Sequence, residues 1–134
     1  MKIIEEYPLN ILVAEDNAIN QKLIMRIFQM LGYTIQIASN GYKVIEILDQ
    51  MKIDIIFMDI QMPEMDGIEA TSKIIAQWGD QRPMIIAMTA NALQSDKETY
   101  RAAGMDDYIS KPLTVDQIRI GIEKWAPVLN KGKK

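Results

Sequence analysis

Residues 54–67 read DIIFMDIQMPEMDG, an apolar run that ends in a carboxylate and continues into a loop with proline and glycine. A short apolar run bounded in this way is typical of a parallel strand that is buried on both faces. The carboxylate of Asp59 would then lie at the carboxyl end of that strand, where open α/β sheets bind their ligands. Asp59 is therefore the candidate reacting group.

The rest of the chain alternates short apolar runs with amphipathic segments. We expect strands at 9–14, 33–38, 54–59, 84–89 and 105–109. We expect helices from about 18 to 31, one that includes 44–51, one that starts near 67, one from about 91 to 103, and a last one that opens at 114–117. This alternation predicts an α/β fold in which a parallel sheet is covered on both faces. We expect a flavodoxin-like, doubly wound five-stranded sheet in the order 2-1-3-4-5 with five helices, so that the first and third strands are neighbours.

The predicted helices carry end signals and apolar faces. Asn17 is a suitable N-cap for the first helix and Gly32 a suitable end, and residues 114–117 have the spacing of a capping box. The apolar side chains expected to face the core are Ile19, Leu23, Ile27 and Leu31 in the first helix, Val44, Ile47, Leu48 and Met51 in the second, Ile68, Ile75 and Trp78 in the third, and Ile118, Ile122 and Trp125 in the last.

Composition limits the function. A chain of 134 residues with 49% hydrophobic content predicts one domain, at 9–127, with an N-terminal extension at 1–8 and a basic tail at 128–134. A net charge of −3 gives no reason to expect nucleic-acid binding by this domain. The absence of cysteine and histidine excludes disulfides, thiolate or imidazole metal sites, a Ser-His-Asp triad and a phosphohistidine on this chain.

The longest apolar run, 84–88, is far shorter than the roughly 20 residues that a membrane-spanning helix needs. We therefore expect a cytoplasmic domain without membrane contact of its own, which is compatible with a membrane-attached parent protein. The sequence leaves monomer and homodimer equally open.

Several polar residues fall where predicted strands end. Glu15 and Asp16 follow the first strand, Asp59 ends the third, Thr89 ends the fourth, and Lys111 follows the fifth. In the order 2-1-3-4-5 they gather at one edge of the sheet, with the acidic pair facing Asp59. Carboxylates so close together need a cation, and an oxygen-only ligand set selects a hard ion such as Mg²⁺.

Each of these residues also has a structural interpretation when taken alone. Asp16 fits a helix cap, Asp59 a turn, Thr89 a strand terminus, Lys111 a solvated loop, and Tyr108 ordinary packing. Their combination, in this order and at these strand ends, favours a functional site.

The chain resembles the receiver domain of two-component response regulators over residues 10–125. The resemblance rests on the Glu15-Asp16 pair, on Asp59 followed by MPEMDG at 62–67, on MTA at 88–90, and on Lys111-Pro112. The sequences of residues 14–21 (AEDNAINQ) and 89–93 (TANAL) are most similar to those of receivers in hybrid sensor histidine kinases.

The resemblance implies a role for each matching residue. Asp59 would accept a phosphoryl group from the phosphohistidine of a histidine kinase or a histidine-containing phosphotransfer domain. Asp16, Asp59 and the backbone carbonyl of Gln61 would bind Mg²⁺ directly, and Glu15 would reach it through water. Lys111 would pair with a phosphoryl oxygen, aimed inward by a cis bond to the proline that follows it.

The resemblance also implies a switch. Thr89 would turn toward the phosphoryl group and Tyr108 would turn into the space left behind, which changes the surface formed by the fourth helix, fifth strand and fifth helix. The chain would lose its phosphoryl group by slow self-dephosphorylation and would not be a stand-alone turnover enzyme. The downstream effector is not indicated by the sequence.

Three other classes of protein compete with this interpretation. A haloacid-dehalogenase-type hydrolase expects a second acid two residues after the nucleophile, where this chain has Gln61. A phosphate-independent module of the same fold usually lacks the acceptor, the acidic pair or the lysine, and all are present here. A flavin- or nucleotide-binding domain is disfavoured because no glycine-rich loop follows the first strand.

Overall fold

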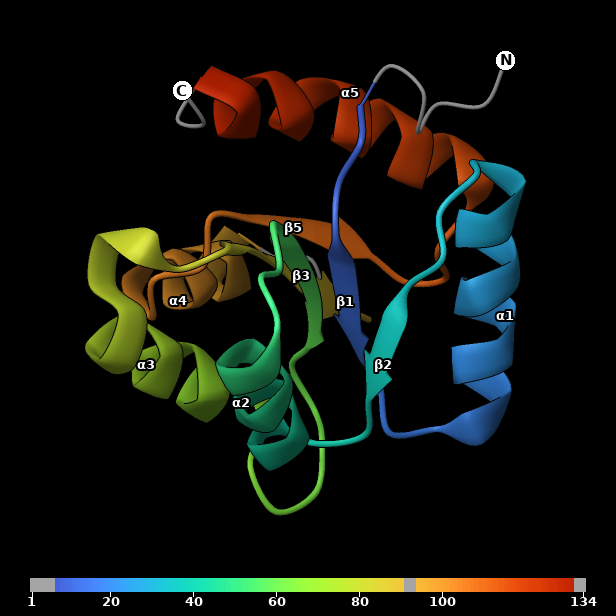
Figure 1. Ribbon diagram of the computed structural model, residues 1–134. Coiled ribbons are helices and arrows are strands. Elements are labelled where there is room, and N and C mark those ends of the chain that lie inside the picture. Colours follow the sequence, from blue (N-terminus) through green and yellow to red (C-terminus); the bar gives the residue numbers. More distant parts are fainter. Residues whose placement is uncertain (1–6, 91–93, 132–134) are drawn as a thin grey trace.

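The computed structural model describes residues 7–90 and 94–131 and shows a five-stranded parallel sheet between two layers of helices (Figure 1). The strand order is β2-β1-β3-β4-β5, so the predicted flavodoxin-like order is confirmed. The strands are β1 (Ile11–Ala14), β2 (Gln36–Ala38), β3 (Ile55–Asp59), β4 (Met84–Thr89) and β5 (Asp107–Ser110). The helices are α1 (Ala18–Met30), α2 (Gly41–Gln50), α3 (Gly67–Trp78), α4 (Gln94–Ala102) and α5 (Val115–Lys131), with a short 3-10 turn, η2 (Gly79–Gln81), after α3.

The elements match the predicted ones in type and order. β1 and β2 begin later than predicted, at Ile11 and Gln36. Three predicted features fall on residues outside the described part: the first turn of the fourth helix at 91–93, residues 1–6 of the N-terminal extension, and residues 132–134 of the basic tail. Among the described residues, no helix combines the length and apolarity needed to cross a membrane.

The two faces of the sheet bury separate apolar clusters. Alternate strand residues such as Val13 and Phe57 pack with α1 and α5, whereas Leu12 and Met58 pack with the layer formed by α2, α3 and α4 (Figure 1). Every residue of β3 is buried. An apolar run without alternation is therefore the pattern that this central strand needs, and it holds Asp59 at the edge of the sheet.

Phe57 joins the helices of one layer to the sheet. Its ring centroid lies 5.2 Å from that of Phe28 in α1 and 5.8 Å from that of Trp125 in α5, and both pairs are edge-on. Such pairs contribute about 0.5–1.5 kcal/mol each beyond the burial of their area. The aromatic contacts of Phe57 in the core thus hold in place the strand that ends in Asp59.

The predicted apolar faces are right for the last helix, largely right for the third, and partly wrong for the first two. Ile118, Ile122 and Trp125 are buried, as expected. In α1, Ile19 and Leu23 are 78% and 51% exposed, and the buried helix residues are Ile24, Ile27 and Phe28. Met51 is exposed beyond the end of α2. In α3, the half-buried Ile68 and Trp78 pack against the core as predicted, and Ala70, Thr71 and Ile74 are buried more deeply.

In α1 the reason is the helical repeat. A step of four residues turns an α-helix by about 400°, so a set chosen at every fourth position drifts by about 40° per step and leaves the buried face after two or three steps. Ile19 and Ile27 therefore cannot both lie at the centre of one narrow stripe.

The predicted helix ends are confirmed. The side-chain oxygen of Asn17 accepts hydrogen bonds from the backbone amides of Ile19 and Asn20. Thr114 and Gln117 form the reciprocal bonds of a capping box, at 3.1 and 3.2 Å. Gly32 ends α1 with a φ of 98°, a conformation that glycine adopts without a side-chain penalty.

Asp107, the first residue of β5, connects the sheet to α5. Its carboxylate accepts hydrogen bonds from Trp125 Nε1 at 2.8 Å and from Lys124 Nζ at 3.0 Å. Burial raises the pKa of Asp107, but the bonds from Trp125, from the Tyr108 amide and from Lys124 outweigh burial, so the pKa lies below its ordinary value of 3.8. The ionised form of Asp107 therefore stabilises the fold.

We expect Asp107→Asn to lower the free energy of unfolding by about 1 kcal/mol at neutral pH, because Trp125 and Lys124 would lose their charged partner. Since the pKa is lowered by folding, the wild-type advantage is fully present above the ordinary carboxyl pKa and disappears as the pH falls through the lower folded value. Urea titrations at several pH values measure this difference. The surface variant Asp116→Asn is the control, and a difference between wild type and Asp107→Asn that persists unchanged into the acid range would contradict the assignment.

Candidate functional site

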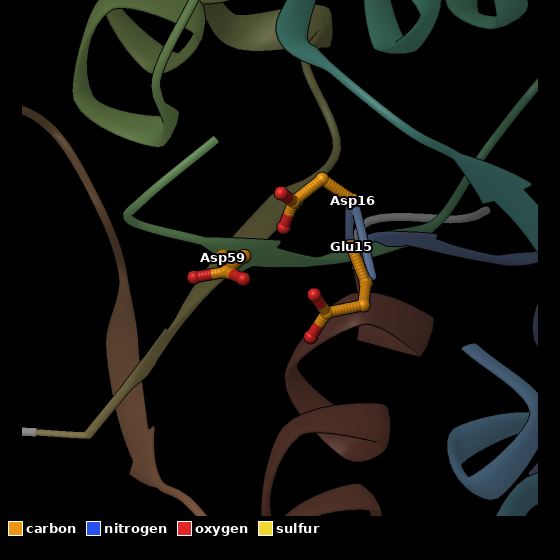
Figure 2. Close-up of side chains that lie close together, drawn as sticks. All are labelled: Glu15, Asp16 and Asp59. Carbon is orange, nitrogen blue, oxygen red and sulfur yellow. The ribbon is translucent and has the colours of Figure 1, made fainter. Parts of the chain in front are cut away.

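Three carboxylates meet at the carboxyl edge of the sheet. β1 pairs with β3 in a register that sets Ala14 opposite Met58, so the residues that follow them lie close together. One carboxylate oxygen from each of Glu15, Asp16 and Asp59 lies within 4.8 Å of the other two. Figure 2 shows the acidic pair at the end of β1 facing Asp59 at the end of β3.

Lys111 completes this group from the loop after β5. Its Nζ lies 2.9 Å from Oδ2 of Asp59 and 3.2 Å from Oε1 of Glu15. Burial lowers the pKa of Lys111, but the bonds to Asp59 and Glu15 outweigh burial and hold the pKa above its ordinary value. The ammonium group is therefore charged at neutral pH. The peptide bond to Pro112 is cis, as the resemblance predicts.

The two acids after β1 have different surroundings. Glu15 is 1% exposed, and its second carboxylate oxygen accepts a hydrogen bond from the Asn17 amide at 3.1 Å. Both of its oxygens are thus bonded within the protein, because Lys111 donates to the other. Asp16 is exposed at the mouth of the site. An added ligand can therefore approach Asp16 without displacing a bond of Glu15.

The loop after β3 holds Asp59 in place. The backbone amide of Gln61 donates to Oδ1 of Asp59 at 3.1 Å, and the amide of Gly67 donates to the carbonyl of Ile60 at 3.0 Å. Gly67 packs so closely that a Cβ there would lie 2.3 Å from the carbonyl oxygen of Asp59. A glycine at this position is what allows α3 to begin directly beneath the acceptor strand.

Two cavities open from Asp59. A wide one of about 740 Å³ is lined by residues that include Asp16, Asp59 and Gln61. A smaller one of about 210 Å³ runs from Asp59 to Thr89 and Tyr100, with Lys111 in its wall. Each of the predicted residues Glu15, Asp16, Asp59, Gln61, Thr89 and Lys111 therefore lines at least one of these two cavities.

Two tyrosines, one in β5 and one in α4, differ in their contacts with the site. Tyr108 is half-buried, and the ammonium group of Lys97 lies 4.7 Å from its ring centroid. Tyr100, which is not among the predicted site residues, is buried and has its hydroxyl 2.9 Å from Oγ1 of Thr89. Tyr100 is the only aromatic residue in α4, whose other residues are polar apart from Ala102. That isolated aromatic is the signal that could have pointed to it.

The donor set fits a hard divalent cation. All three acids offer oxygen only, and the group carries three negative charges against the one ammonium of Lys111 among the residues that approach it. Oxygen donors with room for retained waters suit Mg²⁺ better than they suit softer transition metals. The exposed Asp16 and the wide cavity provide that room.

Fold and site together define an α/β domain that gathers carboxylates and a lysine at the carboxyl ends of β1, β3 and β5. The model of the response regulator receiver domain family matches residues 11–123. The chain belongs to this family, the receiver domains of two-component signalling.

The chain is similar to curated hybrid signal transduction proteins, among them histidine kinases. The chain is 39% identical over 129 residues to hybrid signal transduction histidine kinase H of Dictyostelium discoideum, a match that covers 93% of this chain and 9% of the kinase. It is 44% identical over 117 residues to hybrid signal transduction protein dokA of the same organism, covering 86% of this chain and 7% of dokA. The predicted similarity to receivers of hybrid kinases is confirmed, and the chain spans less than a tenth of the length of these relatives.

Two solved structures bear on the site. The receiver domain of a sensor histidine kinase from Pseudomonas aeruginosa, which has a magnesium ion coordinated in its active-site cleft, is 37% identical, with a TM-score of 0.80 over 89% of this chain and 98% of that one. The receiver domain of Ssk1 from Saccharomyces cerevisiae, crystallised with the histidine phosphotransfer protein Ypd1, is 28% identical, with a TM-score of 0.80 over 90% of each chain.

We expect Gly67→Ala to lower the free energy of unfolding by about 1–3 kcal/mol, because the new methyl group would overlap the Asp59 carbonyl and the Met58 side chain. Urea unfolding followed by circular dichroism measures the change. Ser72→Ala on the exposed side of α3 is the control. Equal stability of the two variants would show that the loop has more freedom than its packing indicates.

Proposed function

We propose that the chain accepts a phosphoryl group on Asp59 from a phosphohistidine on another protein or domain. The observation that carries the proposal is the contact between Asp59 and Lys111 beside the acidic pair. A carboxylate held against a charged ammonium, with a cation site next to it, matches the needs of phosphoryl transfer. The hybrid-kinase relatives support a place for this receiver in a phosphorelay.

In this reaction an oxygen of Asp59 attacks the phosphorus atom, the phosphorus–nitrogen bond breaks, and the electron pair leaves with the imidazole of the donor. The product on this chain is an acyl phosphate. Lys111 would move from the Asp59 oxygen to a phosphoryl oxygen as charge develops there. When bound, Mg²⁺ supplies the remaining positive charge at the phosphoryl oxygens.

The surroundings of each acid support the proposed ligand set. Asp16 is exposed and would bind Mg²⁺ directly, together with Asp59 and the backbone carbonyl of Gln61. Glu15 would act through water, because both of its carboxylate oxygens are already bonded to protein groups.

The acyl phosphate would then change the surface of α4, β5 and α5. The Thr89 hydroxyl borders the cavity that leads from Asp59, so it could donate to a phosphoryl oxygen once one is present. Tyr108 remains the predicted second residue of the switch. Attack by water would return the chain slowly to its starting state, so the domain would turn over its own phosphate without being a stand-alone enzyme.

Incubation with acetyl phosphate and Mg²⁺ is expected to add one phosphoryl mass to the intact chain. The adduct should be absent from Asp59→Asn and from samples treated with a chelator, because the acceptor oxygen and the cation are both needed. Intact-mass spectrometry measures it, with Asp116→Asn, an exposed acid in the first turn of α5, as the matched control. An adduct that forms equally on Asp59→Asn would refute the assignment of the acceptor.

The apolar surface beside Asp59 fits a protein donor. Ile19 and Leu23 on α1 are exposed, and Leu23 borders a cavity of about 310 Å³ that reaches Pro112 and the rim of the site at Lys111. Unpartnered apolar side chains so close to the acceptor favour docking of a partner there. We propose that a histidine-containing phosphotransfer domain, of the kind crystallised with the Ssk1 receiver, binds across α1 and the loop after β5.

Leu23→Gln is expected to slow phosphoryl transfer from phosphorylated Ypd1 by about tenfold, since an anchor in an apolar interface contributes roughly 1–2 kcal/mol. Labelling by acetyl phosphate should not change, because that small donor needs no docking surface. Met30→Gln, an exposed residue at the other end of α1, is the matched control. The proposed location of the docking surface is refuted if Leu23→Gln accepts the phosphoryl group from Ypd1 as fast as Met30→Gln and the wild type do.

A further inference from the structure

Tyr100 anchors α4 next to the acceptor site. Of the α4 residues whose side chains are described, 97–102, Tyr100 is the only buried one, at 8% exposure. Its hydroxyl lies 2.9 Å from Oγ1 of Thr89, and both side chains line the cavity that contains Asp59 and Lys111. The position of α4 is therefore linked to the Thr89 hydroxyl through one hydrogen bond.

We propose that Tyr100 is a positioning residue that holds the Thr89 hydroxyl toward α4 in the unphosphorylated state. Phosphorylation of Asp59 then draws the Thr89 hydroxyl toward the phosphoryl group, breaks its bond to Tyr100 and frees α4 to move. This inference rests on the proposed function, because it requires a phosphoryl group on Asp59.

The energetics follow from burial. Within the described residues, the hydrogen bond of the Tyr100 hydroxyl is to Thr89, and a buried hydroxyl without a partner is unfavourable. A bond made in only one of two states stabilises that state by its own free energy. The bond between Tyr100 and Thr89 therefore opposes the phosphorylated arrangement and weakens the binding of a phosphoryl group.

The placement of Tyr108 supports this role for Tyr100. The ring of Tyr108 packs against the ammonium group of Lys97, which is also on α4, at 4.7 Å from the centroid. Tyr100, by contrast, already occupies the space beside Thr89. An inward turn of Tyr108 would therefore follow, and not precede, the release of Tyr100.

Beryllofluoride, a stable mimic of the phosphoryl group, tests the proposal by titration calorimetry in Mg²⁺. Tyr100→Phe removes the hydroxyl and keeps the ring, so we expect it to bind beryllofluoride about three- to tenfold more tightly than wild type does, the range that one hydrogen bond spans. Tyr42→Phe, an exposed tyrosine on α2, is the matched control and should bind as wild type does. Thermal unfolding of each variant reports on its folding.

The Thr89→Ala background tests whether Tyr100 acts through Thr89. There the added Tyr100→Phe substitution should change the affinity by less than about twofold, because the hydroxyl that it releases is gone. Amide spectra provide a second readout: α4 signals should shift when wild type binds beryllofluoride and should already be displaced in that direction in free Tyr100→Phe.

The outcomes separate the two proposals. If wild type fails to bind beryllofluoride in Mg²⁺, the proposed function is wrong. If wild type binds and Tyr100→Phe binds equally or more weakly, the restraint by Tyr100 is overturned while the function stands. The same tightening in the Thr89→Ala background would also overturn it, because Tyr100 would then act without Thr89.

Discussion

The interaction on which the site depends is the contact of Lys111 with two buried carboxylates. Glu15 and Asp59 are 1% and 5% exposed, and both bond to the same ammonium group. Without that charge, two acids would lie side by side in a poorly solvated place, which is strongly unfavourable. The strand order supplies the geometry, because β1 and β3 are neighbours and the loop after β5 reaches across to them. The strand order that defines the fold therefore also brings the residues of the site together.

Much of this arrangement is predictable from the sequence, because its signals are local. A buried strand without alternation, followed by a carboxylate and a glycine, indicates the end of β3 and places Asp59 at the sheet edge. The buried face of α1 is less predictable: Ile19 and Ile27 both fit a spacing of four, but the helix turns the first into solvent. The error is informative, because the exposed Leu23 borders the cavity at Lys111.

The contact between Tyr100 and Thr89 is the part that sequence reasoning misses. It joins a helix to a strand end across eleven residues, and it depends on how α4 packs and not on any motif. The sequence instead predicts Tyr108 as the switch residue, because Tyr108 lies three residues before Lys111 in the stretch that resembles the family. Tyr100 lies in no family motif. Its one sequence signal is that it is an isolated aromatic in a mostly polar helix, which indicates an anchoring side chain.

The rigidity of the acceptor strand and the weak anchoring of α4 explain how a small chemical change could have a distant effect. β3 is buried along its whole length and paired on both sides, so Asp59 has little freedom to respond to a phosphoryl group. Of the α4 side chains that the structure describes, residues 97–102, one is buried. In a two-state equilibrium, the element that moves is the one whose contacts cost least to break. A single bond at Thr89 is then enough to decide which position of α4 is favoured.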